Sequence, residues 1–341
     1  MQILCITSVK DEAPYLVEWL AHYRGLGVDA FEIYHNDCTD GTEALLEEVA
    51  QEGWLTHHAN PFQGKRTVQW QALVRAAKSS AYLKADWVLF VDVDEFLTLR
   101  APHETLHSLI ETCPDGTDAV TLPWRFFGSN GAVAKRDEPV TERFSRAAPL
   151  NLAVPAGHFF KSLYRPSAFR APGVHRPKAG DTPPNWVNSE LKPLPDVFAE
   201  QNNRINLWGH FPNEPALHLN HYAVKSAQEF MGKRARGLPN KMDLEIGLGY
   251  WVGRNFNQQA CTRIARHAAR TAETVERLRT PQVRKIEAHA NKHHEEQFKA
   301  LVSQRREAEL YWLLQLAGGS NAPHPRNAHS HLERLRKAQD G

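Results

Sequence analysis

The sequence predicts an α/β protein with a mixed sheet flanked by helices and a helical extension at its C-terminal end. Three observations lead to this prediction: short apolar runs typical of buried strands, helical periodicity between those runs, and a change to charged helical patterns near residue 255. We therefore expect a main domain over residues 1–250, a helical extension over 255–318 and a disordered tail over 319–341.

The composition is that of a globular protein with a substantial core. Of the 341 residues, 42% are hydrophobic and 23% are charged. The net charge of +2 argues against a general nucleic-acid-binding protein. The four cysteines are scattered and form no CxxC pair, which fits a reducing cytosol and provides neither a zinc motif nor a disulfide framework.

The chain has no recognisable targeting or membrane-spanning segment. Its first residues lack the basic region of a signal peptide, and the apolar run there is too short. No window approaches the roughly 20 apolar residues of a membrane helix. We expect a soluble, cytoplasmic protein, and the sequence leaves open a peripheral position at the inner face of the membrane.

The first half of the chain alternates predicted strands and helices. A strand over 3–9, a helix over 14–23 and a strand over 30–35 predict a βαβ unit with parallel strands. Pro14 suits the first turn of that helix. The elements predicted next are a helix beginning at residue 42, a strand over 54–58, a helix over 68–78 and a strand over 88–91.

The last of these strands runs into the acidic residues Asp92, Asp94 and Glu95. Because strand side chains alternate with period 2, Asp92 and Asp94 are predicted to leave the strand on the same side. Adjacent carboxylates tolerate each other when a cation lies between them, and Mg²⁺ and Mn²⁺ prefer such oxygen ligands. The pattern therefore suggests a metal–diphosphate site, and an acidic, solvated turn is the alternative.

A second polar turn, Asn36-Asp37-Cys38-Thr39-Asp40-Gly41-Thr42, follows the strand over 30–35. Asp40 or Thr39 can cap the following helix. Side chains at the carboxyl end of a strand also face the ligand crevice of an open α/β sheet, so the turn is equally a candidate for contacting a nucleotide.

The second half of the chain contains fewer regular patterns. Residues 177–205 are rich in Pro and Asn and are expected to form a long loop or lid. Ser226 and Glu229 form a predicted capping box. Long helices are expected over 262–279 and 282–317, where they pack on the main domain, dimerise or lie at a membrane surface. Gly64-Lys65 lacks the spacing of a P-loop, and the histidines at 293–294 do not form HExxH.

Taken in order, four motifs resemble the nucleotide-sugar half of glycosyltransferase families 2 and 92, which have a GT-A fold and a DxD motif. The resemblance covers roughly residues 1 to 240, with Asp11 in place of the usual Asn. The motifs are Lys10-Asp11-Glu12, the turn over 36–42, Asp92-Val93-Asp94-Glu95-Phe96 and Asn220-His221-Tyr222.

The resemblance implies roles for several of these residues. It places Glu12 and Asp37 near the nucleoside, and it makes Asp92 and Asp94 ligands of an Mn²⁺ or Mg²⁺ ion that holds the diphosphate. His221 is the candidate third metal ligand, and a hydrogen-bonded core histidine is the alternative. The candidates for donor binding are Glu12, Asp37, Asp40, Gln69, Asp92 and Lys225.

The implied reaction is metal-dependent, inverting transfer of a sugar from a nucleotide-sugar, in the first instance a UDP-sugar, to a hydroxyl group of a glycan or another acceptor. Such a transfer needs a carboxylate base near the acceptor. The Glu-Asp base motif common in the family is not visible here. Three residues are candidates for this base: Glu142, in a motif that also resembles the family, Asp181 in the long loop, and Glu95 beside the acidic pair.

Two other functions compete with this interpretation. A nucleotidyltransferase also pairs carboxylates around Mg²⁺, but it opens with a Gly-rich loop where this chain has residues 10–14. A non-catalytic sugar-binding or scaffold protein is the second alternative. The presence of Asp92, Asp94 and His221 argues against it.

Overall fold

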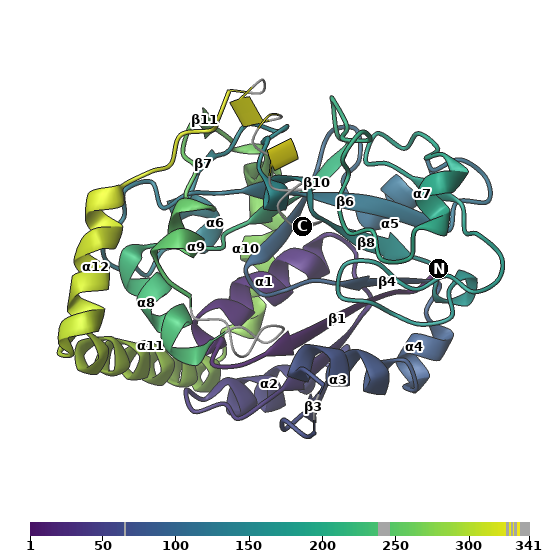
Figure 1. Ribbon diagram of the computed structural model, residues 1–341. Helices are drawn as coiled ribbons and strands as arrows, with labels where there is room; N and C mark the ends of the chain where they lie inside the picture. Colours follow the sequence, from purple (N-terminus) through teal and green to yellow (C-terminus); the bar gives the residue numbers. More distant parts are fainter. Residues whose placement is uncertain (65, 238–245, 325–326, 329, 331–332, 335–341) are drawn as a thin grey trace.

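Within the described residues, nine strands form one sheet that helices cover on both faces (Figure 1). The structure is a computed structural model, and it describes all residues except 65, 238–245, 325–326, 329, 331–332 and 335–341. The strands of the sheet are β1 (Ile3–Val9), β2 (Ala30–His35), β3 (Leu55–Ala59), β4 (Trp87–Phe90), β5 (Glu95–Leu99), β6 (Ala119–Phe126), β8 (Phe160–Tyr164), β9 (Trp186–Val187) and β10 (Leu217–His221).

The strand order is β3-β2-β1-β4-β8-β6-β10-β5, with β9 beside β6. The four strands from β3 to β4 are parallel. β8 runs antiparallel to both β4 and β6, and β10 is parallel to β6. Consequently β1, β2, β3, β4, β6 and β10 all end at the same edge of the sheet, which we call the carboxyl edge. This architecture confirms the predicted mixed α/β sheet flanked by helices.

Alternating side chains of the central strands pack against helices on the two faces. On one face, Ile3 and Cys5 share a core with α1 (Ala13–Gly25) and α2 (Thr42–Ala50). On the other face, Leu4 and Ile6 pack with α3 (Val68–Ala76) and α4 (Ser80–Lys84). Burial on both faces explains why β1 begins with four successive apolar residues, Ile3 to Ile6.

The C-terminal part of the chain forms three helices, α10 (Ala268–Leu278), α11 (Pro281–Val302) and α12 (Arg305–Ala317). α10 packs along α1, and α11 contacts α1, α2 and α8 (Ala227–Arg236). The prediction of one helix over 282–317 was wrong, because the chain turns at Ser303 and Gln304. This turn returns α12 to the protein and buries Leu314 against Phe230 and Trp251.

The segment over 177–205 is packed against the protein and contributes β9 to the sheet and a short helix, α7 (Asp196–Glu200). Trp186 and Phe198 are buried, and the guanidinium of Arg176 lies 4.4 Å and 4.6 Å from their ring centroids. The segment is therefore a packed cover of one sheet face.

The other elements are β7 (Arg146–Ala147) paired with β11 (Gln259–Ala260), α5 (Leu106–Ile110), α6 (Val140–Arg143), α9 (Leu248–Val252) and the 3-10 helices η1 (Pro155–His158), η2 (Pro166–Ala168) and η3 (Arg263–His267).

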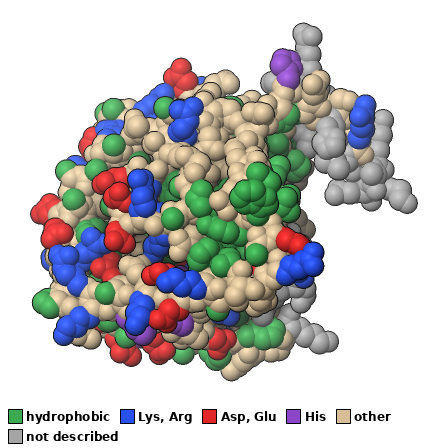
Figure 2. Space-filling view, turned by 90° about the vertical axis from the view of Figure 1, so that its left-hand side faces the viewer, with side chains coloured by type: hydrophobic (Ala, Val, Ile, Leu, Met, Phe, Trp, Pro, Cys, Tyr) green, Lys and Arg blue, Asp and Glu red, His purple; other side chains and the backbone are tan. Residues whose placement is uncertain are grey.

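One face of the molecule carries a cluster of exposed apolar side chains (Figure 2). The large hydrophobic side chains that are exposed include Trp312, Leu313 and Leu316 of α12 and Val252 of α9. Among the described residues, no helix has both the length and the apolar character needed to cross a bilayer. Part of the tail predicted over 319–341 lies outside the described residues, and the division into domains stays a prediction.

Candidate active site at the carboxyl edge

Polar side chains from several strands meet at the carboxyl edge because these strands end there. Glu12 follows β1, and Asp37 follows β2. Asp92 and Asp94 lie in the turn between β4 and β5, and His221 is the last residue of β10. The topology therefore brings together motifs that are far apart in the sequence.

Asp92 pairs with a lysine that the sequence did not reveal as a candidate. The Nζ atom of Lys161, on β8, lies 3.0 Å from Asp92 Oδ2 and 3.4 Å from Glu95 Oε2. Gln69 donates a hydrogen bond of 2.7 Å from its Nε2 atom to Asp92 Oδ1. Both carboxylate oxygens of Asp92 thus have partners within the protein. The side-chain amide of Gln69, a candidate for donor binding, is one of these partners.

Lys161 is completely buried, as is Glu95. Burial alone would lower the pKa of Lys161, but the carboxylates of Asp92 and Glu95 reverse this effect and raise it. Lys161 therefore carries a positive charge inside the protein. Glu95 Oε2 also accepts a hydrogen bond of 2.8 Å from the backbone N–H of Asp92, so Glu95 supports the acidic turn from beneath.

Asp94 pairs with a different lysine. The Nζ atom of Lys233, on α8, lies 2.7 Å from Asp94 Oδ2. Burial would raise the pKa of Asp94, but Lys233 and His221 together hold it well below its usual value. The sequence predicted that Asp92 and Asp94 leave the strand on one side and share one cation. The strand instead ends at Phe90, and the turn directs the two carboxylates to separate lysines.

His221 is buried beside Asp94, with its Nε2 atom 3.6 Å from Asp94 Oδ1. Its ring lies 4.4 Å from the ring of Trp124 and 5.5 Å from that of Phe126, measured between centroids. Both aromatic residues are buried core residues. Burial lowers the pKa of His221, so the imidazole is neutral, and its buried Nδ1 atom has no hydrogen-bond partner among the described residues.

Three cations lie next to Glu12 and Asp94. Arg236 pairs with Glu12 at 2.7 Å, and Lys233 pairs with Asp94. The ammonium of Lys225 lies 4.3 Å from the centroid of the Tyr15 ring and makes no ion pair with a described carboxylate. Burial lowers the pKa of Lys225, although Glu12 and Asp94 oppose this effect. The cluster therefore has one more cation than carboxylates, and Lys225 is the cation available for an anionic ligand.

The two acidic residues of the turn after β2 have different environments. Asp37 is exposed and adopts a φ of 48°, whereas Asp40 is completely buried. Asp40 Oδ1 accepts hydrogen bonds from the backbone N–H and the hydroxyl of Thr42, and Oδ2 accepts one from the backbone N–H of Ala13. The Nε2 atom of His294, on α11, lies 2.9 Å from Asp40 Oδ2. Asp40 therefore joins α1, α2 and α11 in the interior, which corrects the expectation of direct donor contact.

Substitution of His294 by Ala is expected to lower the free energy of unfolding by about 1–3 kcal/mol, because it removes a hydrogen bond from a buried carboxylate. His293→Ala is the matched control, since the His293–Thr39 contact at 3.2 Å is exposed. Urea denaturation measures both variants. Equal stability of the two would contradict a role of His294 in fixing α11 to the turn.

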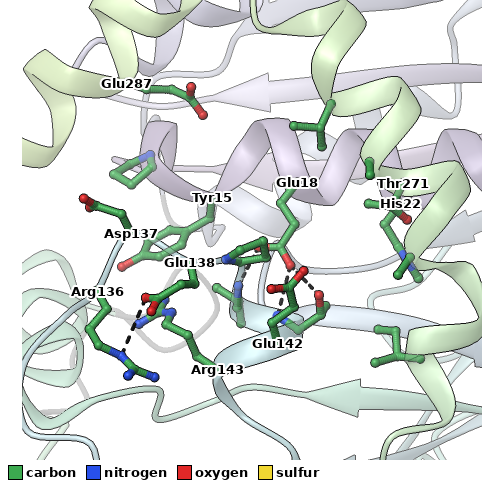
Figure 3. Close-up of a pocket in the computed structure, with 18 of the residues that line it drawn as sticks. Tyr15, Glu18, His22, Arg136, Asp137, Glu138, Glu142, Arg143, Thr271 and Glu287 are labelled. Carbon is green, nitrogen blue, oxygen red and sulfur yellow. Dashed lines mark hydrogen bonds and ion pairs between the residues drawn. The ribbon is translucent and has the colours of Figure 1, made fainter.

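The three candidate bases lie in different surroundings. Glu95 is buried beneath Asp92, and Asp181 is exposed and lines no described cavity. Glu142 is exposed on α6 and lines a cavity of about 900 Å³ (Figure 3). Of the three, Glu142 alone combines exposure with a ligand-sized space.

α6 is held in place by two buried carboxylates. Glu18, on α1, accepts hydrogen bonds from the backbone N–H groups of Val140 and Thr141 at 2.7 Å and 3.0 Å. Arg143 donates two hydrogen bonds of 2.9 Å to Glu229 on α8. Glu229 belongs to the predicted capping box, which the structure confirms. These contacts fix the backbone that carries Glu142.

Asp94 and His221 fit a divalent cation better than Asp92 does. Their Oδ1 and Nε2 atoms are 3.6 Å apart, a separation that small adjustments convert into that of neighbouring ligands. The described part of the chain contains no group of three or more His, Cys, Asp or Glu side chains arranged to hold a metal. An ion at this pair would take its remaining ligands from the diphosphate and water, as Mg²⁺ commonly does.

Lys161 is the residue near the acidic motif that the sequence did not reveal as a candidate. One signal for Lys161 was present, because it lies within the apolar segment Phe159-Phe160-Lys161-Ser162-Leu163-Tyr164. A lysine inside a predicted buried strand needs a carboxylate partner. Lys233 was a candidate for offsetting diphosphate charge, but no comparable signal indicated its pairing with Asp94, since solvated lysines are common on helices.

Comparisons with known proteins find relatives of this chain in plants. Matches include glycosyltransferase family 92 proteins of Oryza sativa subsp. japonica, at 25% identity over 48% of this chain and 27% of that protein, and of Arabidopsis thaliana, at 32% over 27% and 16%. In these alignments the chain spans less than a third of the relatives' own lengths.

Solved structures give more distant matches. They include the UDP complex of S. aureus TarS 1–349, with 12% identity, coverage of 90% of this chain and 92% of that chain and a TM-score of 0.33. Glucosyl-3-phosphoglycerate synthase from Mycobacterium tuberculosis matches at 20% identity, with 49% and 58% coverage and a TM-score of 0.28. The model of glycosyltransferase family 92 matches residues 2–194, more than half of the sequence, and the chain therefore belongs to glycosyltransferase family 92.

Proposed function

We propose that the protein transfers a sugar from a nucleotide-sugar, with UDP-sugars as the first donors to consider, to a hydroxyl group of an acceptor. One observation carries the proposal: Asp94 and His221 lie side by side at the carboxyl edge, next to a cluster of cationic side chains. The chain that carries this site belongs to glycosyltransferase family 92. The leaving group of such a reaction is a nucleoside diphosphate, whose developing charge needs nearby positive groups.

In this proposal the donor lies along the carboxyl edge. Glu12 and the exposed Asp37 face the nucleoside, and the uncommitted ammonium of Lys225 binds the diphosphate. Asp94 and His221 hold Mn²⁺ or Mg²⁺, which when bound neutralises charge on the diphosphate as a Lewis acid. Asp92 is held by Lys161 and Gln69, so it shapes the turn.

The acceptor hydroxyl attacks the anomeric carbon from the side opposite the diphosphate. Its oxygen forms the new bond, the bond to the diphosphate oxygen breaks, and the configuration inverts. Glu142 is the proposed base that takes the hydroxyl proton, because its carboxylate is exposed to the cavity beside α1.

The proposal is tested by incubating the purified protein with a panel of radiolabelled UDP-sugars and Mn²⁺ and by identifying the products. Slow transfer to water is expected to release UDP and free sugar, and EDTA is expected to stop the release. Accumulation of pyrophosphate would indicate a nucleotidyltransferase instead. No turnover of any nucleotide-sugar, together with no change in melting temperature on addition of UDP and Mn²⁺, would contradict the proposed function.

A further inference from the structure

The cavity of about 900 Å³ lies between α1, the loop that carries α6, and the C-terminal helices. Tyr15, Glu18 and His22 of α1 line one side, and the loop that carries α6 lines a second side (Figure 3). The third side belongs to η3, α10 and α11. Its volume falls within the range of about 300–1,000 Å³ that is typical of small-molecule sites.

A row of small apolar side chains from η3 and α10 lines one side of the cavity. Ala265, Ala268 and Ala272 line the cavity, and Val275 continues the row. The spacing of three and four residues places these side chains on one side of the helix. Larger residues at these positions would fill the space, so the alanines keep the cavity open.

Most charges at the cavity are already paired. Arg279 pairs with Glu287 at 3.1 Å, Arg284 with Glu276 at 3.3 Å and Arg136 with Glu138 at 3.6 Å. Arg143 is committed to Glu229, and the ammonium of Lys135 is hydrogen-bonded to Asn291. Within the described residues every arginine of the lining therefore has a carboxylate partner, and Lys135 is the one lining cation whose partner is a neutral amide.

The carboxylates of Asp137 and Glu142 differ, because both are exposed and neither makes an ion pair with a described residue. Carboxylate oxygens accept hydrogen bonds from hydroxyl groups and repel anions. With the apolar wall of α10, they form a surface suited to a molecule with hydroxyl groups and no negative charge.

The cavity also borders the cation cluster. Tyr15, Lys135 and Asn291 line both this cavity and a smaller hollow of about 40 Å³. Lys225, Lys233 and Arg236 line the other part of that hollow. Tyr15 therefore borders the larger cavity, and its ring contacts Lys225, the lysine proposed to bind the diphosphate.

We propose that this cavity binds the acceptor and that the acceptor is an uncharged saccharide; the inference rests on the proposed glycosyltransferase function. A hydroxyl of the saccharide enters past Tyr15, gives its proton to Glu142 and forms the new glycosidic bond as the nucleoside diphosphate departs. The C-terminal helices thereby supply the wall that selects the acceptor.

Blocking the cavity tests this inference without changing the donor site. Ala272→Trp fills the cavity from the exposed face of α10, and Ala269→Trp is the control, because Ala269 is exposed on the same helix and does not line the cavity. Gluco-, galacto- and manno-oligosaccharides serve as neutral acceptors with the UDP-sugar that the protein hydrolyses. Ala272→Trp is expected to reduce transfer by at least about tenfold and to leave donor hydrolysis unchanged.

The outcomes separate this inference from the proposed function. Normal transfer by Ala272→Trp, or preference for oligosaccharides that carry a uronate or phosphate, would overturn it while donor hydrolysis still supports a glycosyltransferase. Donor hydrolysis with no transfer to any neutral oligosaccharide would overturn the proposed acceptor class. Absence of donor hydrolysis in the unmodified protein would instead count against the proposed function itself.

Discussion

Substitution of Asp94 by Asn is expected to lower kcat/KM for the donor by about a hundredfold or more. Asp94 is the buried carboxylate shared by Lys233 and His221, and its negative charge is what attracts a divalent cation to this position. The amide keeps the shape of the side chain but removes that charge. Release of UDP from the donor at several Mn²⁺ concentrations measures the effect.

A control at the other end of β4 separates chemistry from folding. Asp86 precedes β4 at the opposite edge of the sheet, where its half-exposed side chain accepts a hydrogen bond from the backbone N–H of Gln2. Asp86→Asn is expected to retain activity. UDP and Mn²⁺ together are expected to raise the melting temperature of the Asp86→Asn protein and not that of Asp94→Asn. Full activity of a folded Asp94→Asn protein would refute the proposed role of Asp94.

Substitution of Lys161 by Met is expected to lower the free energy of unfolding by about 3–5 kcal/mol. The change removes the buried cation that lies within 3.4 Å of both Asp92 and Glu95 and leaves these carboxyl groups without it. Urea denaturation monitored by circular dichroism measures the loss. Lys192→Met, at an exposed lysine paired with Glu190, is expected to cause little change.

A second substitution tests the electrostatic cause of the instability. Glu95→Gln in the Lys161→Met background replaces one buried carboxyl group with an amide, so it is expected to recover part of the lost stability. Lys161→Met as stable as the unmodified protein would show that the ion pairs contribute no net stability. Equal stability of the single and double variants would indicate lost packing instead.

The alternation of apolar runs and helical patterns was enough to predict most of the sheet. β2 begins and ends at the predicted residues, and β1 and the capping box at Ser226 were also predicted correctly. These features depend on local chemistry, since a strand buried on both faces is mostly apolar and a helix start is stabilised by a capping side chain. The turn at Ser303 was missed because it depends on where α12 can bury its apolar face.

The candidate site was less predictable because its partners are distant in sequence. Asp92 meets Lys161 across 69 residues and Asp94 meets Lys233 across 139. A motif of two acidic residues identifies where negative charge gathers, but not which cation compensates it. Similarly, the sequence of the turn over 36–42 could not reveal that His294 reaches Asp40 from α11.

The separation of the proposed donor site at the sheet edge from the proposed acceptor wall on the C-terminal helices affects how substrate specificity can change in evolution. In our proposals, one part of the chain handles the donor and another part forms a wall around the acceptor. Acceptor specificity can therefore change by substitutions in the C-terminal helices, or by their exchange in a chimaeric protein, while the donor chemistry stays the same. The His294–Asp40 contact sets the constraint on such an exchange, because a replacement helix must still supply a partner for the buried carboxylate.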